Sequence, residues 1–208
     1  MASRLGDQTA RMQGRVSLNP MRHIDPLGTL LFPALMIFGP LFGYGSGGML
    51  FGWAKPTPVI TRNFRHIRRD DNLTTLAGPA SNLILVVLSV LLLIVIAVAF
   101  PEGRMAVRGA LSGRIGSGDA AQALALLGAL GVEVNLMLMI FNLIPIPPLD
   151  GSHVLRNMLP YNASKMFDQF GWIGFILIFF IGRFVVGALI GPAVDLALLP
   201  LRPFLHAA

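Results

Sequence analysis

The stretch LILVVLSVLLLIVIAVAF, residues 83–100, decides the fold class. It is 18 residues long, and Ser89 is its only polar residue. A run of this length and composition is typical of a transmembrane helix, because about 20 apolar residues cross the hydrocarbon core of a bilayer. The uncharged sequence around it extends from residue 72 to residue 101 and includes Ala77-Gly78-Pro79, where proline suits a first helical turn. We therefore predict a membrane span over residues 77–100.

Two more stretches are long and apolar enough to cross. Residues 120–144 carry one charge, Glu133, and residues 170–194 carry one charge, Arg183. A charge left unpaired at the middle of a span costs at least about 2.5 kcal/mol on insertion scales. We therefore expect the second helix to begin after residue 120, which would bring Glu133 nearer an interface. The alternative for Glu133 is a proton-relay or transport role, and Arg183 can extend to the interface or pair.

The uncharged stretch 27–50 is also apolar, but it does not suit a straight helix. It contains Pro33 and Pro40, and proline interrupts helical hydrogen bonding. It also contains glycines at positions 39, 43, 45, 47 and 48. Basic residues flank it at positions 4, 11, 15 and 22 before it, and at positions 55, 62, 65, 68 and 69 after it. Because positive charge marks the cytoplasmic side, we predict a broken or re-entrant segment that enters and leaves by one face, with a single crossing as the alternative.

The remaining segments are expected to lie outside the hydrocarbon core. Residues 1–26 are interpreted as a membrane-face loop, in which residues 14–18 form a short extended edge. Residues 52–60 form a second extended edge. The glycine-rich residues 104–119 are predicted to be a loop. After Gly191-Pro192 the pattern favours a short interfacial helix.

The composition agrees with a membrane protein. Of the 208 residues, 54% are apolar and 12% are charged, whereas soluble domains average about 25% charged residues. The net charge of +6 lies on loops between apolar runs, which argues against nucleic acid as a partner and indicates a lipid bilayer. We predict a single membrane-embedded domain, residues 1–208, with an all-α polytopic fold. It would have three to four transmembrane helices, the broken or re-entrant segment and the short extended edges.

The sequence FNLIPIPPLDG, residues 141–151, is the most informative motif for function. Three of the four positions from 145 to 148 are proline, and each proline moves the preceding residue out of the helical region. The second span should unwind here, and such backbone is tolerated in a membrane only beside protein or a cavity. Asp150, followed by Gly151, is placed to hold a cation in such a site. The alternative is a solvated Asp-Gly turn outside the membrane.

In their order and spacing, the motifs of this chain resemble the site-2 protease family of intramembrane zinc metalloproteases, in its bacterial branch. The matching stretches lie within residues 4–160. They are Arg15-Val16-Ser17-Leu18-Asn19-Pro20 with Arg22-His23-Ile24-Asp25-Pro26, then Phe51-Gly52-Trp53-Ala54-Lys55-Pro56, then Leu76-Ala77-Gly78-Pro79-Ala80-Ser81-Asn82, and finally Asn142 to Gly151. The last motif is the strongest of them and the Ala-Gly-Pro motif is the weakest.

The resemblance implies a zinc metalloendopeptidase of the bacterial inner membrane that hydrolyses peptide bonds of membrane-spanning protein substrates. It implies that Asp150 is the third protein ligand of a catalytic Zn²⁺, within an unwound metal-site motif over residues 145–160. It also implies that Asn142, at the end of the second span, lies near the substrate backbone. A structural alternative for Asn142 is a buried amide that satisfies the C-terminus of that helix. The sequence does not indicate an oligomeric state.

The resemblance also implies a motif that this sequence does not contain. Such enzymes use H-E-x-x-H on a helix, where two histidines bind zinc and the glutamate activates the metal-bound water. The histidines here lie at positions 23, 66, 153 and 206, and no two are four apart. No catalytic residue is therefore assigned in this chain. We expect that the natural protein begins upstream of Met1, with the general base there, and that the chain alone is inactive.

Three alternatives remain at this stage: a non-catalytic membrane scaffold, a transporter-like protein and a substitute metal site. A transporter would be expected to contain inverted repeats. A substitute site would have to use His, Asp or Glu, because the chain has no cysteine. Asp150 and His153 could share a helical face, although Gly151 favours a turn between them. We interpret His153 as a polar residue of the following helix and His23 as a loop residue hydrogen-bonded to Asp25.

Overall fold

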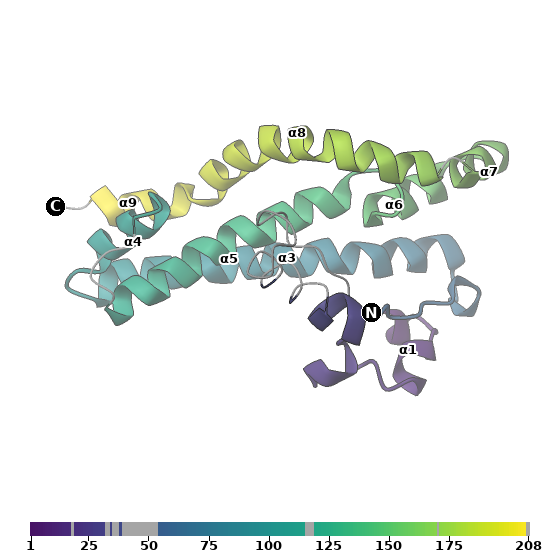
Figure 1. Ribbon diagram of the computed structural model, residues 1–208, viewed down its shortest axis with the longest axis horizontal. Helices are drawn as coiled ribbons and strands as arrows, with labels where there is room; N and C mark the ends of the chain where they lie inside the picture. The colour runs from purple at the N-terminus through teal and green to yellow at the C-terminus, as the bar shows by residue number, and fades with distance from the viewer. Residues whose placement is uncertain are drawn as a thin grey trace. The chain divides into compact units, whose positions relative to one another are not determined.

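The computed structural model describes residues 1–17, 19–31, 34, 38, 54–114, 119–169 and 171–206. Within these ranges the chain is mainly helical and contains no β-strand (Figure 1). This confirms the prediction of an all-α fold. The chain divides into two compact units, Met1–Asp70 and Asp71–Ala208. The assignment of all residues to one membrane-embedded domain stays a prediction.

Three long helices make up most of the second unit (Figure 1). They are α3 (Ile67–Ala99), which begins within the first unit, α5 (Ala120–Leu143) and α8 (Gly171–Ala197), and they contain 33, 24 and 27 residues. Among the described residues, three helical stretches are long and apolar enough to cross a membrane, namely Ile67–Ala99, Ala120–Leu143 and Gly187–Leu205. The polytopic fold predicted from the sequence is therefore confirmed.

Helix α5 begins and ends where local sequence signals place its ends. The side chain of Asp119 accepts a hydrogen bond from the backbone N–H of Gln122 at 2.7 Å, which caps the first turn. The helix ends at Leu143, two residues before Pro145, which removes Ile144 from the helical conformation. Glu133 consequently lies well inside α5 with an exposed side chain. The expectation that this helix begins after residue 120 is wrong.

Helix α3 begins at Ile67 rather than at residue 77. The carboxylate of Asp70 accepts a hydrogen bond from the backbone N–H of His66 at 2.9 Å, and this contact caps the helix in a polar stretch ahead of the apolar run. Pro79 is buried inside α3, not in its first turn. A proline within a helix is tolerated where neighbouring groups compensate for the lost backbone bond.

The segments that follow α3 and α8 differ from the sequence-based expectations. Residues 104–119 are not a loop throughout, because α4 (Gly103–Leu111) forms there. Ala106, Val107 and Ala110 on one face of α4 are buried in the core. Helix α8 continues through Pro192 to Ala197, so the short helix expected after Gly191-Pro192 appears only later, as α9 (Arg202–His206).

Small residues allow α3 and α5 to pack closely. A β-carbon added to Gly128 of α5 would lie 2.8 Å from the Leu93 side chain of α3. Gly131, one turn further on, faces Ser89, the polar residue of the apolar run. Close approach at glycine is a common way for membrane helices to gain packing contacts. The core around this contact includes the fully buried Leu93 and Ala125.

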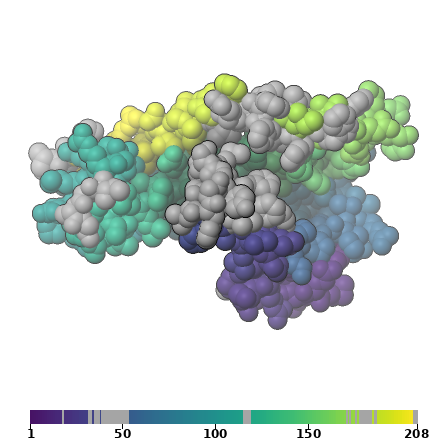
Figure 2. All heavy atoms as spheres, in the orientation of Figure 1, coloured from purple at the N-terminus to yellow at the C-terminus, as the bar shows by residue number. Residues whose placement is uncertain are grey.

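The described residues of the first unit are coloured from purple to blue in Figure 2. The centre of this unit is Asp7, which is completely buried. The carboxylate accepts hydrogen bonds from Oγ1 and the backbone N–H of Thr9, from the backbone N–H of Ile60 at 2.8 Å and from Nδ2 of Asn63 at 3.0 Å. These bonds hold the pKa of Asp7 far below its usual range. The hydrogen bond from Oγ1 of Thr9 lowers the pKa the most. Asp7 thus ties the N-terminal residues to residues 60–63.

The two flanks of the apolar segment 27–50 meet in the first unit. The backbone N–H of Lys55 donates a hydrogen bond to the carbonyl of His23 at 3.0 Å. Residues 26–31 form the helix η3, and residues 54–60 have no regular structure. Most of the segment, with Pro33, Pro40 and the glycines from position 39 on, lies outside the described residues, as do Leu18 and Gly52 of the two expected edges. The re-entrant segment and its alternative, a single crossing, both stay predictions.

His23 has a different partner from the one predicted. Its Nε2 lies 2.9 Å from the carbonyl oxygen of Ser17. Asp25 instead accepts hydrogen bonds from the backbone N–H groups of Leu27 and Gly28, at 3.0 and 2.8 Å. The predicted His23–Asp25 contact is therefore wrong, because the Asp25 carboxylate is taken by the start of η3.

Candidate functional site

The candidate site is built around the break between α5 and the next helix, α6 (Asp150–Met158). Residues 144–149 are not helical, and Ile144 has extended angles of φ −61° and ψ 128°. The expected unwound motif over residues 145–160 is thus restricted to its first part, because helix resumes at Asp150. The proline positions explain the break, since three of these residues cannot donate a backbone hydrogen bond.

Asp150 is the first residue of α6 and is half-buried. Its Oδ2 lies beside Gly78 of α3, where an added β-carbon would be 3.4 Å from that oxygen. The structure therefore brings together two of the stretches that carry the family resemblance. Burial raises the pKa of Asp150, and the nearby His153 opposes this shift. A helix N-terminus also favours a negative charge at this position.

Gly151 allows α6 to begin against the end of α5. A β-carbon added there would lie 2.6 Å from the carbonyl carbon of Leu143 and 2.7 Å from the carbonyl oxygen of Ile144. No side chain fits at such distances. Gly151 belongs to the first helical turn, so the turn expected between Asp150 and His153 is wrong. The glycine serves close packing, not a reversal of the chain.

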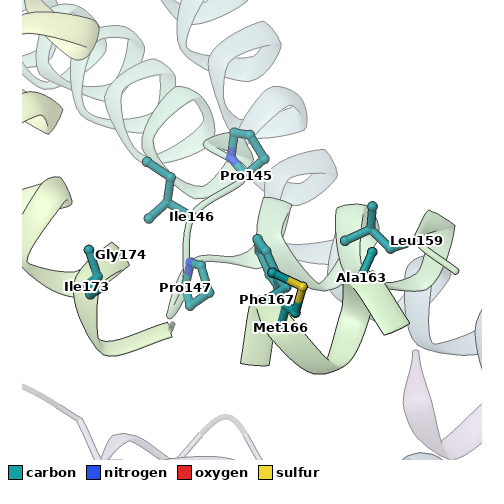
Figure 3. Close-up of a pocket in the computed structure, with 9 residues that line it drawn as sticks. All are labelled: Pro145, Ile146, Pro147, Leu159, Ala163, Met166, Phe167, Ile173 and Gly174. Carbon is teal, nitrogen blue, oxygen red and sulfur yellow. The ribbon is translucent and has the colours of Figure 1, made fainter. Parts of the chain in front are cut away.

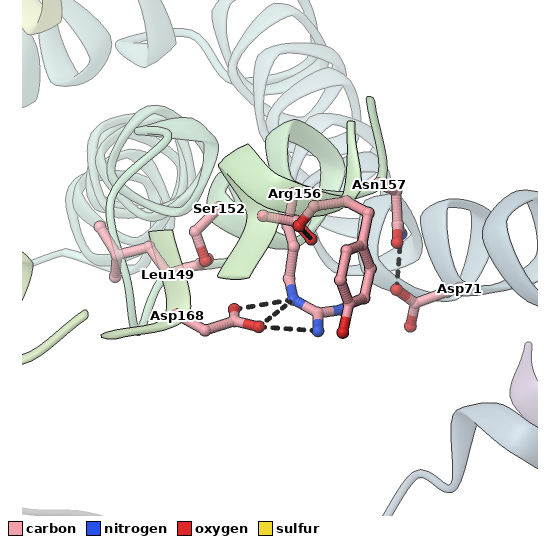
Figure 4. Close-up of polar contacts among 8 residues, drawn as sticks. Asp71, Leu149, Ser152, Arg156, Asn157 and Asp168 are labelled. Carbon is pink, nitrogen blue, oxygen red and sulfur yellow. Dashed lines mark hydrogen bonds and ion pairs between the residues drawn. The ribbon is translucent and has the colours of Figure 1, made fainter. Parts of the chain in front are cut away.

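Polar contacts at the other end of α6 hold this helix to α3 and α7 (Tyr161–Gln169), as Figure 4 shows. Nδ2 of Asn157 donates to Oδ2 of Asp71 and to Oδ1 of Asn72, both at 2.7 Å. Arg156 forms an ion pair with Asp168 of α7, with its Nε 2.8 Å from Oδ1. Asp71 is buried, so the Asn157 bond satisfies a carboxylate that has little access to water.

These contacts define how α6 lies on α3. Asp150 faces Gly78, and Asn157, seven residues later, faces Asp71, seven residues earlier. The two helices therefore run antiparallel along this contact. Sequence reasoning missed Asn157 and Asp71. The available signal was that Asp150 and Asn157 lie seven residues apart, as do Asp71 and Gly78, because residues seven apart share one face of a helix.

An apolar pocket of about 360 Å³ lies beside the unwound stretch (Figure 3). It is bounded by the proline stretch, α7 and the start of α8. Its lining residues are Pro145, Ile146, Pro147, Leu159, Ala163, Met166, Phe167, Ile173 and Gly174. Because nearly all of the lining is hydrocarbon, the pocket suits an apolar side chain or acyl chain.

Asn142 is half-buried in the last turn of α5. Among the hydrogen bonds of the described residues, none involves its side chain. A carbonyl of the last helical turn, that of Phe141, instead accepts a hydrogen bond from the backbone N–H of Ile144 at 3.2 Å. The alternative role of Asn142 as a cap for this helix therefore finds no support, and its contact with substrate stays a prediction.

The described residues do not by themselves provide a zinc site. Nowhere among them do three His, Asp or Glu side chains come together in a way that could hold a metal ion. Catalytic zinc needs three protein ligands and an open position. His153 is exposed, and the His206 side chain lies outside the described residues. Asp150 remains one candidate ligand, and the substitute site of remaining histidines is not supported.

Comparison with known proteins decides the family. No family model matches the chain. The chain is 33% identical over 182 residues to the Bacillus subtilis protein named "Putative zinc metalloprotease YwhC". The matched residues make up 86% of this chain and 71% of that protein. The chain belongs to the site-2 protease family.

A second relative matches over a longer part of the chain. The Mycolicibacterium smegmatis protein named "Putative zinc metalloprotease Rip2" is 29% identical over 194 residues, which is 93% of this chain. The chain spans 61% of the length of that protein. No solved structure matches significantly. The resemblance inferred from the motifs is confirmed, and both relatives are named as putative zinc metalloproteases.

Proposed function

We propose that this chain is part of an intramembrane zinc metalloprotease that cleaves membrane-spanning proteins of a bacterial inner membrane. The observation that supports this most directly is the half-buried Asp150 carboxylate at a helix N-terminus, next to an unwound stretch and against Gly78. In this proposal Asp150 is one ligand of Zn²⁺. The other ligands and the general base would come from residues other than those described.

The unwound stretch is suited to receive an extended substrate backbone. Its three N–H groups are already used, since Ile144, Ile146 and Leu149 each donate to a nearby carbonyl. Within the described residues, no hydrogen bond reaches the carbonyls of Pro145, Pro147 or Pro148. We propose that these carbonyls accept N–H groups of the substrate, as in strand addition.

Two further features fit the same substrate. Asn142 lies two residues before the unwound stretch and would contact the substrate backbone with its amide. The apolar pocket beside Pro145 and Pro147 would accept an apolar side chain, which membrane-spanning substrates have in abundance. A helical substrate would first have to unwind, because helical hydrogen bonds shield its peptide bonds.

The test compares two carboxylate variants with the wild type. Each protein is expressed from the complete in-frame gene and purified in detergent. We expect about one zinc per chain and cleavage of a transmembrane test substrate. Asp150→Ala should lose both zinc and cleavage. The control is Asp195→Ala, which removes an exposed carboxylate in α8 and should change neither. Zinc and cleavage retained in Asp150→Ala would refute the ligand assignment, and a folded wild-type protein without zinc would favour the scaffold.

A further inference from the structure

A second pocket, in the first unit, gathers positive charge. It has a volume of about 310 Å³ and is lined by Gln13, Arg15, Met21, Arg22, Ile24 and Lys55. We call it the basic pocket. Three of its side chains are cationic, and none is acidic. Like charges repel one another when gathered at one site, so such a pocket is most stable when an anion occupies it.

The backbone holds both arginines of the basic pocket in place. Nη1 of Arg15 donates to the carbonyl of Arg22, and Nη1 of Arg22 donates to the carbonyl of Gly14 at 3.0 Å. Gly14 has φ +66°, and a β-carbon there would overlap Nη1 of Arg22. The glycine thus admits the guanidinium. Pre-organised side chains lose less conformational entropy when they bind a ligand.

Lys55, which follows the apolar segment 27–50 in the sequence, also lines the basic pocket. Its backbone N–H donates to the carbonyl of His23, the residue next to Arg22. The pocket therefore lies where the two flanks of that segment meet. In a membrane protein, an uncharged segment with cationic flanks places those flanks at the level of the lipid headgroups.

The carboxylates of this unit are not available to neutralise the pocket. Residues 1–70 contain nine Lys and Arg residues but only three acidic ones, Asp7, Asp25 and Asp70. Asp7 is bound by residues 9, 60 and 63, Asp25 accepts from the start of η3, and Asp70 caps α3. Arg15, Arg22 and Lys55 form no ion pair within the described residues.

We propose that the basic pocket binds a phosphoryl group, such as the headgroup of an anionic phospholipid supplies. Guanidinium groups match the geometry of phosphate oxygens, and an ammonium adds a compact charge. The exposed side chains of Arg22 and Lys55 leave the pocket open to a headgroup. A free phosphate ester offers the same chemistry, so the experiment must separate the two sources.

The test measures lipid retention by native mass spectrometry on the detergent-purified 208-residue chain. We expect retention of phosphatidylglycerol and little retention of phosphatidylcholine. Lys55→Gln and Arg22→Gln should each weaken phosphatidylglycerol binding at least about tenfold, which corresponds to one charge-assisted contact. Arg62→Gln is the matched control, because it removes one exposed positive charge of the same unit outside the pocket.

Two further measurements make the test decisive. If inorganic phosphate displaces the lipid, the free anion is sufficient for binding to the basic pocket. If only glycerol 3-phosphate displaces it, the pocket recognises the lipid headgroup. Thermal unfolding checks folding, and Lys55→Gln leaves both arginine–backbone bonds intact. Equal binding of the two lipids, or equal weakening by Lys55→Gln and Arg62→Gln, would overturn the proposal, because either result indicates diffuse surface charge.

Discussion

Oδ2 of Asp150 lies against Gly78, with room for a β-carbon at 3.4 Å. The two residues are far apart in sequence and belong to different helices, yet a β-carbon at position 78 would be in ordinary van der Waals contact with the carboxylate. A close contact of this kind beside a candidate metal ligand connects the packing of α3 with the chemistry of α6.

The effect of a substitution at residue 78 on the site should therefore increase with the size of the new side chain. Gly78→Ala should leave zinc content and thermal unfolding nearly unchanged, because 3.4 Å is an ordinary contact. Gly78→Leu should displace the carboxylate and reduce zinc content in the protein read from the complete gene. Both are measured by metal analysis on protein in detergent. Full zinc in Gly78→Leu would show that Asp150 does not depend on this contact.

Gly151→Ala should destabilise the protein by more than 1 kcal/mol, on the order of the cost of overpacking a core. The added methyl group would meet the backbone of Leu143 and Ile144. The control is Gly187→Ala in α8, where no atom lies within 4 Å, and it should be neutral or stabilise by up to about 1 kcal/mol. Thermal unfolding in detergent measures the difference. Equal effects of the two substitutions would contradict the packing role of Gly151.

Asn157→Leu should cost about 1 to 3 kcal/mol, because it leaves the buried carboxylate of Asp71 without its donor. It should also loosen α6 against α3. The control, Asn162→Leu, changes an exposed asparagine of α7 and should have little effect. Hydrogen exchange at the amides of α6 reports the local loosening. If exchange rises equally in both variants, Asn157 does not hold α6.

Asp7 should make the stability of the first unit depend on pH. Its pKa in the folded protein is lower than the ordinary value of 3.8, chiefly because of the hydrogen bond from Thr9. The stabilisation is therefore fully present above about pH 4 and is lost as the pH falls further, toward the folded pKa. The Ile60 amide, which donates to Asp7, should lose exchange protection over this range. Asp7→Asn should remove the pH dependence, and a dependence that persists would assign it to another group.

The sequence predicted the elements whose ends carry local signals. The C-terminal end of α5 could be read from Pro145, because a proline acts over a few residues. The break before Asp150 was predictable for the same reason. The start of α5 was placed too late, because the capping side chain of Asp119 was not recognised. Helix α4 was missed because its glycines and mixed charges suggest a loop, whereas burial of Ala106 and Val107 against neighbouring helices stabilises it. Pro79 was misplaced because tertiary packing outweighs its local preference.

Of the candidate site, Asp150 was singled out from the sequence, but the arrangement of residues around it was not predicted. Asp150 was identified from its motif, yet nothing in the sequence places its carboxylate against Gly78. Asn157 was missed because its partner, Asp71, lies in another helix, and the spacing that puts Asn157 on the same helix face as Asp150 does not identify that partner. Such pairings depend on how helices are juxtaposed, which periodicity alone does not determine.

The contact of Gly151 with the last turn of α5 couples the position of Asp150 to the tilt of that helix. With 24 residues, α5 is about 36 Å long, which exceeds a hydrocarbon thickness of about 30 Å. A helix of this length tilts to match its bilayer, and it tilts more in a thinner one. Because α6 starts directly on its end, the depth of the carboxylate would follow membrane thickness, so lipid chain length becomes a variable that acts on this site.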